Sequence, residues 1–188
     1  MTKKSTNGKG SKVEPQDAIA MLKADHRLVE DLFEKFEKAT RKEQKKKIAQ
    51  QICLELTIHT IIEEEVFYPA CKEVVEEDLL NEAYVEHDGA KMLIAEIGQG
   101  SPDDMFFDAK VTVLSEEIKH HVKEEEKRSE GMFAQARAAG LDMEALGEMM
   151  RVRKLELQET LTPGELPPPE TRTMKGAEVS YGAPVGSL

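Results

Sequence analysis

The chain has 188 residues, of which 34% are charged and 5% aromatic, and its formal net charge at pH 7 is −11. We expect neither nucleic acid nor membrane as a partner, because an acidic chain repels polyanions and no apolar run approaches the roughly 18 residues of a spanning helix. Cys53 and Cys71 would lie about 27 Å apart on one helix, too far for a disulfide, and two isolated thiols favour a reducing cytoplasm.

The first half of the chain predicts two helices. Residues 1–14 are polar and basic with no apolar segment behind them, which indicates a disordered tail and no secretory signal. From Pro15 to about Ala39, apolar side chains recur every three or four residues, the period of an amphipathic helix. A second helix follows the basic run RKEQKKK, and Pro69 is expected to kink or shorten it.

Two further long helices follow. A short acidic break at 76–78 precedes the third helix. The sequence GQGSPDD then combines two terminating glycines with Ser101 as an N-cap and Pro102 in the first turn of the fourth helix, which Gly140 ends.

The end of the chain predicts a short extra helix and a tail. Asp142 is the expected N-cap of this fifth helix, whose buried side would be Leu146, Met149, Met150, Val152 and Leu155. After Thr160 the sequence TPGELPPPE indicates a flexible or polyproline tail that could recruit a protein partner.

No segment alternates like a strand, so the prediction is an all-α protein: an up-down-up-down four-helix bundle over 15–140, an additional short helix over 141–160 and a Pro-rich flexible tail over 161–188.

Histidines fall on the apolar stripes of all four long helices. In two helices the histidine is followed four residues later by a glutamate, which places both side chains on the same face. A rise of 1.5 Å per residue brings the first three histidines to nearly the same level of the bundle, while the start of the fourth helix is less well defined. A buried unpaired carboxylate demands a cation. The candidate metal ligands are therefore His26, His59, Glu63, His87, His121 and Glu125.

The doublet His120-His121 leaves two registers open. His121 shares the apolar stripe of the fourth helix and pairs with Glu125, whereas His120 shares a charged face. The two EEE runs of the chain align only if His120 pairs with Glu124. We choose His121 with Glu125, and we expect the other glutamates of 63–65 and 124–126 on solvated faces.

The type and number of ligands indicate the metal. Six ligands are too many for one tetrahedral zinc ion, and carboxylates that bridge two ions together with imidazole favour a dinuclear iron site. No HExxH motif is present, so a zinc protease is not expected. Tyr84, one turn before His87, is expected in the core, and the alternative is a hydrogen bond from its hydroxyl to the site.

Four segments carry a resemblance to a known family. ADHRLVEDLFEKF, LTIHTIIEEEVFYPA, YVEHDGAKMLIAEI and LSEEIKHHVKEEE, within roughly 16–136, resemble bacterial hemerythrin-like (HHE cation-binding) domains. The resemblance implies a four-helix bundle with an oxo- or hydroxo-bridged non-haem centre of two iron ions. The four histidines would be terminal ligands and Glu63 and Glu125 the bridges. An open position on one iron would take up O2.

The chain departs from the family's oxygen carriers at one point. Those proteins present two histidines four residues apart on the third helix, whereas here Ala83 and Lys91 flank His87 at that spacing. One iron would lack a histidine, which argues against stable, reversible O2 carriage. We therefore expect a soluble cytoplasmic protein that binds or senses O2 or iron, more a binding protein than an enzyme. The alternative is a di-iron enzyme acting on peroxide, nitric oxide or ferrous iron.

Overall fold

The computed structural model describes residues 17–175, so the predicted tail 1–14 lies outside the described residues. The elements are α1 (Ala18–Lys38), α2 (Lys42–Ile62), the π-helical turn η1 (Glu63–Phe67), α3 (Tyr68–Cys71), α4 (Glu77–Gln99), α5 (Phe107–Glu126), α6 (Met132–Ala138) and α7 (Met143–Thr160). None of the described residues forms a strand, and the predicted all-α class is confirmed.

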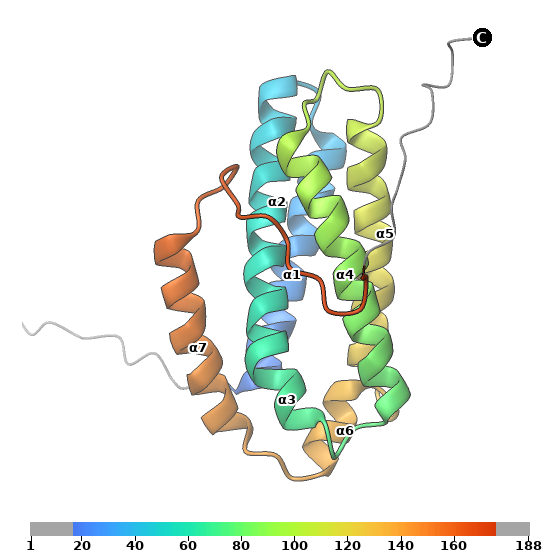
Figure 1. Cartoon of the computed structure of the whole chain (residues 1–188), viewed down its shortest axis with the longest axis vertical. Coiled ribbons are helices and arrows are strands. Elements are labelled where there is room, and N and C mark those ends of the chain that lie inside the picture. Colours follow the sequence, from blue (N-terminus) through green and yellow to red (C-terminus); the bar gives the residue numbers. More distant parts are fainter. Residues whose placement is uncertain (1–16, 176–188) are drawn as a thin grey trace, which may run out of the picture.

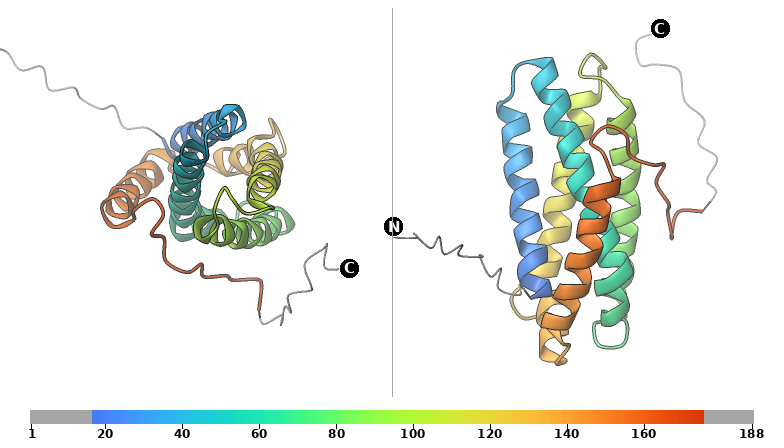
Figure 2. Two further views of the ribbon diagram at one scale, coloured as in Figure 1. Left: turned by 90° about the horizontal axis from the view of Figure 1, so that it is seen from above. Right: turned by 90° about the vertical axis from the view of Figure 1, so that its left-hand side faces the viewer.

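Four long helices form the predicted bundle. α1, α2, α4 and α5 run alternately up and down, and each packs against two of the others to give a square section in the view from above (Figures 1 and 2). α7 lies outside this square, against α1, α2 and η1. The short helices α3 and α6 lie together at the end of the bundle where α1 begins (Figure 1).

Local sequence explains where the first and last helices begin. Asp17 caps α1 by accepting a hydrogen bond from the Ala20 N–H at 2.7 Å. Asp142 caps α7 in the same way, with the Ala145 N–H at 2.9 Å, as the sequence predicts.

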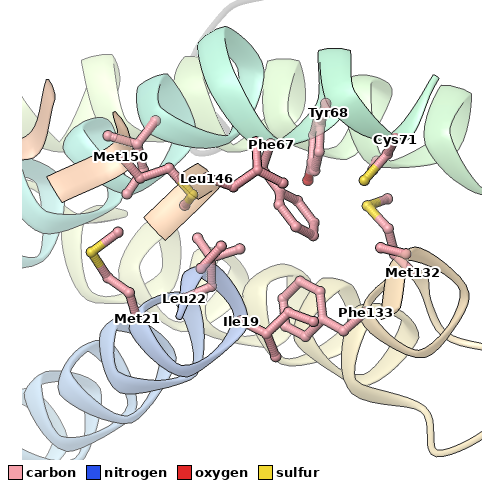
Figure 3. Close-up of a cluster of buried hydrophobic side chains, with 14 of the residues drawn as sticks. Ile19, Met21, Leu22, Phe67, Tyr68, Cys71, Met132, Phe133, Leu146 and Met150 are labelled. Atoms are coloured by element: carbon pink, nitrogen blue, oxygen red, sulfur yellow. The ribbon is translucent and has the colours of Figure 1, made fainter. Parts of the chain in front are cut away.

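The interior consists of two apolar clusters. The first apolar cluster lies at the end where α1 begins and includes Ile19, Leu22, Phe67, Tyr68, Cys71, Met132, Phe133 and Met150. In Figure 3 Phe67 faces Phe133, and Cys71 faces Met132. The second apolar cluster lies toward the other end and includes Val29, Phe33, Phe36, Ile52, Leu56, Ile94, Phe107 and Leu114. The histidines of α1 and α2 fall between the two clusters in the chain, so a polar layer crosses the middle of the bundle.

The fourth helix differs from the prediction at both ends. It begins at Phe107, because the side chains of Ser101 and Asp104 accept backbone N–H groups within the preceding loop and close a turn there. It ends at Glu126 rather than Gly140, and α6 follows as a separate helix. This break lets Phe133 fold beneath the bundle, where its ring stacks on His26 with centroids 5.9 Å apart.

α7 has a different buried face from the one we predicted. Leu146 and Met150 are buried as expected, but Met149, Val152 and Leu155 are exposed. The helix packs on the outside of the bundle along one narrow line, so the buried stripe continues to Leu157 and leaves its flanks in solvent.

The chain after α7 lies against the bundle. We expected a flexible tail from residue 161, but 161–175 runs back across α2 toward α4 (Figures 1 and 2). Residues 176–188 lie outside the described residues. Within the described part of the chain, no helix has the length and apolar character to cross a membrane.

Gly131 lies so close to the backbone at the end of α5 that no side chain fits there. A Cβ at this position would lie 2.6 Å from both Glu125 O and Lys127 N. Gly131→Ala should therefore lower the free energy of unfolding by about 2 kcal/mol, since backbone must move to relieve the clash.

Gly98→Ala is the matched control, because nothing lies within 4 Å of its added Cβ. This change should be neutral or stabilising by up to about 1 kcal/mol. Urea unfolding followed by circular dichroism measures both variants, and equal midpoints for the two would contradict the packing argument.

Candidate metal centre

The structure brings the six predicted ligands into one layer of the bundle. Each bundle helix contributes at least one of them, and η1 contributes a glutamate. None is more than 5% exposed: His26, His59, Glu63, His87, His121 and Glu125. That they bind a metal stays a prediction, which the geometry below supports.

Four of the side chains form what we call the first half-site: His26, His59, Glu63 and Glu125. The two imidazole Nε2 atoms lie 3.2 Å apart. Glu63 Oε2 lies 3.1 Å from His59 Nε2, and Glu125 Oε2 lies 3.3 Å from His26 Nε2. Donors at right angles around an ion about 2.1 Å away lie about 3 Å apart, so this spacing suits a shared cation.

The second half-site consists of Glu63, His87 and His121. The two Nε2 atoms again lie 3.2 Å apart, and Glu63 Oε2 is 3.3 Å from His87 Nε2. Glu125 presents its other oxygen to this side, 3.6 Å from His121 Nε2. Glu63 thus belongs to both half-sites and Glu125 faces both, as carboxylates that bridge two ions do.

Unpaired oxygens provide a test of whether a cation fits. Both carboxylate oxygens of Glu63 and Oε2 of Glu125 are buried without a hydrogen-bond partner among the described residues. Burying a charged oxygen without compensation costs several kcal/mol per ion, by an order-of-magnitude rule. A donor set of imidazoles and carboxylates suits divalent transition metals. The residues therefore fit a pair of metal ions.

Each imidazole turns its other nitrogen, Nδ1, toward a carboxylate that we call an outer carboxylate. The pairs are His26 with Glu126 at 2.8 Å, His59 with Asp25 at 3.7 Å, His87 with Glu64 at 3.1 Å and His121 with Glu86 at 2.8 Å. In three of these pairs the Nδ1–H can donate a hydrogen bond to the carboxylate, which leaves the Nε2 lone pair facing inward, whereas His59 Nδ1 lies beyond hydrogen-bond distance of Asp25. The Nε2 atoms of all four rings face one another in pairs, as metal ligands do.

The outer carboxylates follow a rule around the bundle. Every one is the chain neighbour of a ligand on one helix and holds a histidine of the next helix: Asp25 from α1 to α2, Glu64 from η1 to α4, Glu86 from α4 to α5, and Glu126 from α5 to α1. We had expected Glu64 and Glu126 on solvated faces, and for Glu64, which is 7% exposed, this was wrong. The adjacency of an acid to each ligand was the signal that could have identified them.

The site shifts the pKa values of its own groups. Burial by itself would lower the pKa of His59, but the negative charges of Glu63 and Asp25 outweigh it and raise the pKa to about 10. Burial would likewise raise the pKa of Glu63, yet His59 and His87 hold it well below its ordinary value. Since a metal needs the neutral imidazole, its binding must displace a proton from His59, whereas Glu63 is already ionised.

The π-helical turn η1 reshapes the helix at its glutamate ligand. The Tyr68 N–H donates to Glu63 O five residues back, and Pro69 has no N–H to donate. The helix therefore continues through η1 into α3, where we expected Pro69 to kink or shorten it. The extra residue in this turn rotates Tyr68 inward together with Phe67, and both are fully buried.

Tyr68 is the site residue that the sequence analysis missed. Its hydroxyl donates to Glu125 Oε1 at 3.1 Å and lies 3.2 Å from His87 Nε2 and 3.4 Å from His121 Nε2. The phenol thus enters the second half-site. Tyr84 packs its ring against Tyr68, with centroids 5.2 Å apart, and remains outside the site.

A cavity of about 10 Å³ adjoins the histidines on the side of the second apolar cluster. Its apolar walls are Val29, Leu56, Ile118 and Val122. A space of this size holds about one water-sized molecule, so only a very small ligand fits there without movement of the walls.

The sequence also matches a known protein family. The family model described as Hemerythrin HHE cation binding domain matches residues 17–133. The chain belongs to this family. The predicted resemblance is confirmed, and with it a cation-binding domain whose buried histidines and glutamates can hold metal.

Two similar proteins place this domain in context. A crystal structure of a hemerythrin HHE cation binding domain-containing protein from Mycobacterium kansasii superposes with a TM-score of 0.65 and 22% identity, over 77% of this chain and 88% of that one, which shows the same fold. A protein of Nostoc sp. described as a DNA nickase is 32% identical over 111 residues. That match covers 59% of this chain and 31% of the Nostoc protein, so the chain corresponds to less than a third of that relative.

The register of α5 predicts which of its two histidines binds metal. The structure places His121 in the layer, whereas the side chain of His120 is 57% exposed. His121→Ala should therefore reduce the metal that the purified protein retains, and His120→Ala should leave it unchanged. Elemental analysis of both variants after metal loading measures this, and the reverse pattern would show that His120 with Glu124 is the correct pair.

Proposed function

We propose that this chain is a non-haem di-iron protein that binds or senses O2, or iron itself, in the reducing cytoplasm. The observation that carries the proposal is that two groups of metal-binding side chains share Glu63 and both face Glu125. Two carboxylates that span two histidine pairs call for two ions rather than one.

The choice of iron rests on the ligands. Four imidazoles with two carboxylates offer mixed nitrogen and oxygen donors, without the thiolates that favour softer metals. Cys53 and Cys71 are free and buried, and neither belongs to the groups of metal-binding side chains among the described residues. When bound, a pair of ferrous ions would supply two electrons and a coordination position for a small ligand.

The side chains of the chain define what that ligand can be. The small cavity beside the histidines admits about one water-sized molecule, which suits O2 or another diatomic and excludes larger substrates. Apolar walls on both sides of the layer keep bulk water from the site. The DNA-nicking activity named for the Nostoc relative is not part of the proposal, because a net charge of −11 opposes DNA binding.

The deciding measurement is the near-ultraviolet and visible spectrum after anaerobic loading with Fe2+, then air, then removal of oxygen. We expect charge-transfer bands on exposure to air. Their loss on deoxygenation would indicate reversible binding, and their persistence a sensor or oxidase. Absence of bands from an iron-loaded protein would overturn the proposal.

Glu63→Ala tests the bridge within the same experiment. Without this carboxylate the protein should fail to retain the pair of ions and should show no bands. Glu65→Ala is the matched control, because Glu65 lies two residues away and pairs at the surface with Arg153 at 2.7 Å. Full iron retention by the Glu63 variant would remove the bridging role.

An enzymatic reaction with peroxide is the second candidate function, and Tyr68 favours it. Its buried O–H lies among the ligand atoms of the second half-site, where it would serve as a proton donor if a pair of iron ions bound peroxide. Burial raises the Tyr68 pKa, and the charges of Glu125 and Glu63 raise it further, so the phenol keeps its proton at neutral pH.

Tyr68→Phe removes this hydroxyl and little else. If the protein turns over peroxide, the variant should do so about 100-fold more slowly, the usual contribution of a positioned proton donor, with its iron content unchanged. Tyr84→Phe is the control at the neighbouring ring, and steady-state assays of peroxide loss compare the two. Equal rates for wild type and Tyr68→Phe would exclude this role.

A further inference from the structure

The segment after α7 crosses the outside of the bundle and passes beside the layer of predicted ligands. We call residues 161–175 the strap. It runs across α2 to α4 (Figures 1 and 2). A cavity of about 570 Å³ lies between its middle part and the two helices. Hydrogen bonds attach the strap to α4 and η1 at residues 170–174.

Asp88 holds that end. Its carboxylate is fully buried. One oxygen, Oδ2, accepts hydrogen bonds from Arg172 N at 2.9 Å, Thr173 N at 2.6 Å, Thr173 Oγ1 at 2.7 Å and Met174 N at 3.3 Å. Asp88 directly follows His87, so the strap is fixed to the chain neighbour of a predicted ligand.

From this anchor the strap reaches an outer carboxylate. Arg172 Nε donates to Glu64 Oε2 at 3.0 Å. Lys91 donates to Glu64 Oε1 at 2.7 Å and to the strap at Glu170 O at 3.2 Å. The same Glu64 Oε1 faces His87 Nδ1 at 3.1 Å. Both oxygens of Glu64 are therefore held, one by the strap and one by Lys91 and the imidazole.

The guanidinium of Arg172 has a second contact. It lies over the ring of Tyr84, 5.4 Å from the centroid, and that ring packs on Tyr68. Both residues that the Arg172 guanidinium contacts, Glu64 and Tyr84, thus adjoin groups of the second half-site. No part of the strap contacts a ligand of the first half-site in the hydrogen bonds and ion pairs of the described residues.

We infer that the strap is a working part of the second half-site, in which Arg172 is a positioning residue that fixes Glu64 and, through it, His87. The inference rests on the proposed function, because it assumes a metal ion at each half-site. Outer partners of metal-bound histidines commonly change metal affinity by about 10- to 100-fold. Detaching the strap should thus weaken one ion and spare the other, which makes occupancy of the second half-site depend on the C-terminal segment.

The test is an anaerobic titration of the full chain with Fe2+, followed by calorimetry. Wild type should bind two ions. Arg172→Gln should bind one ion as wild type does and the other about tenfold more weakly. Arg172→Lys, which retains the charge, should recover part of the loss.

Arg153→Gln is the matched control. Arg153 also joins a C-terminal element to η1, through a bidentate pair with Glu65 at 2.7 and 3.1 Å, but Glu65 faces no histidine. This variant should bind both ions normally. Mössbauer spectra with 57Fe add a readout that a merely structural role would not move, since Arg172→Gln should alter the signal of one iron only.

The outcomes separate this inference from the proposed function. If wild type binds no pair of iron ions, the proposed function fails and the inference fails with it. If wild type binds two and Arg172→Gln binds two with unchanged affinities and spectra, the inference alone is overturned. Equal weakening of both ions, or an equal effect of Arg153→Gln, would show that the strap supports only the fold and would also overturn it.

Discussion

The burial of four imidazoles and two carboxylates in one layer is the constraint on which the rest of the structure depends. Such groups cannot be left uncompensated in an apolar interior. The outer carboxylates compensate the buried imidazoles, and each lies beside a histidine of the next helix. Because every helix of the square both gives and receives such a contact, the ring fixes the helices at one level. The two apolar clusters then close the layer from both ends, and the break between α5 and α6 lets Phe133 stack on His26.

Three of the four outer carboxylates have a cationic side chain as a further partner. Lys154 of α7 pairs with Asp25, Arg172 of the strap pairs with Glu64, and Arg27 pairs with Glu126. At these three places the order from the interior outward is imidazole, carboxylate and cation. A half-buried network of this kind is stable only when each member has its partners. α7 and the strap lie outside the square of helices, and each brings a cation to one outer carboxylate, while α7 also buries Leu146, Met150 and Leu157 in the first apolar cluster.

Much of this arrangement follows from sequence period. The apolar stripes repeat every three to four residues, so they locate the long helices, and a histidine with a glutamate four residues later must share a face. The same reasoning selected His121 over His120, and the structure places His121 inside.

The features that the sequence analysis missed depend on contacts that leave no periodic pattern in the sequence. Tyr68 turns inward only because of η1, and a single extra residue in a helical turn leaves no mark in the pattern. Glu64 lies beside a ligand, so periodicity assigns it to the surface, while its partners Lys91 and Arg172 come from distant parts of the chain. α7 was misread because its apolar residues outnumber those that one outer contact can bury.

The two half-sites differ in what surrounds them, and this difference bears on the chemistry. Each has two histidines and a share of the same two glutamates. The small cavity lies toward the second apolar cluster, walled by Val29 and Leu56, whereas the Tyr68 hydroxyl enters from the first apolar cluster. A diatomic ligand and the phenolic proton would therefore approach the layer from opposite ends. Because Glu125 accepts the Tyr68 hydroxyl at 3.1 Å, the phenolic proton is held on the side of the first apolar cluster, away from the cavity. Binding of a diatomic ligand in the cavity would therefore require only the ligand layer, whereas a reaction that consumes protons would also draw on Tyr68.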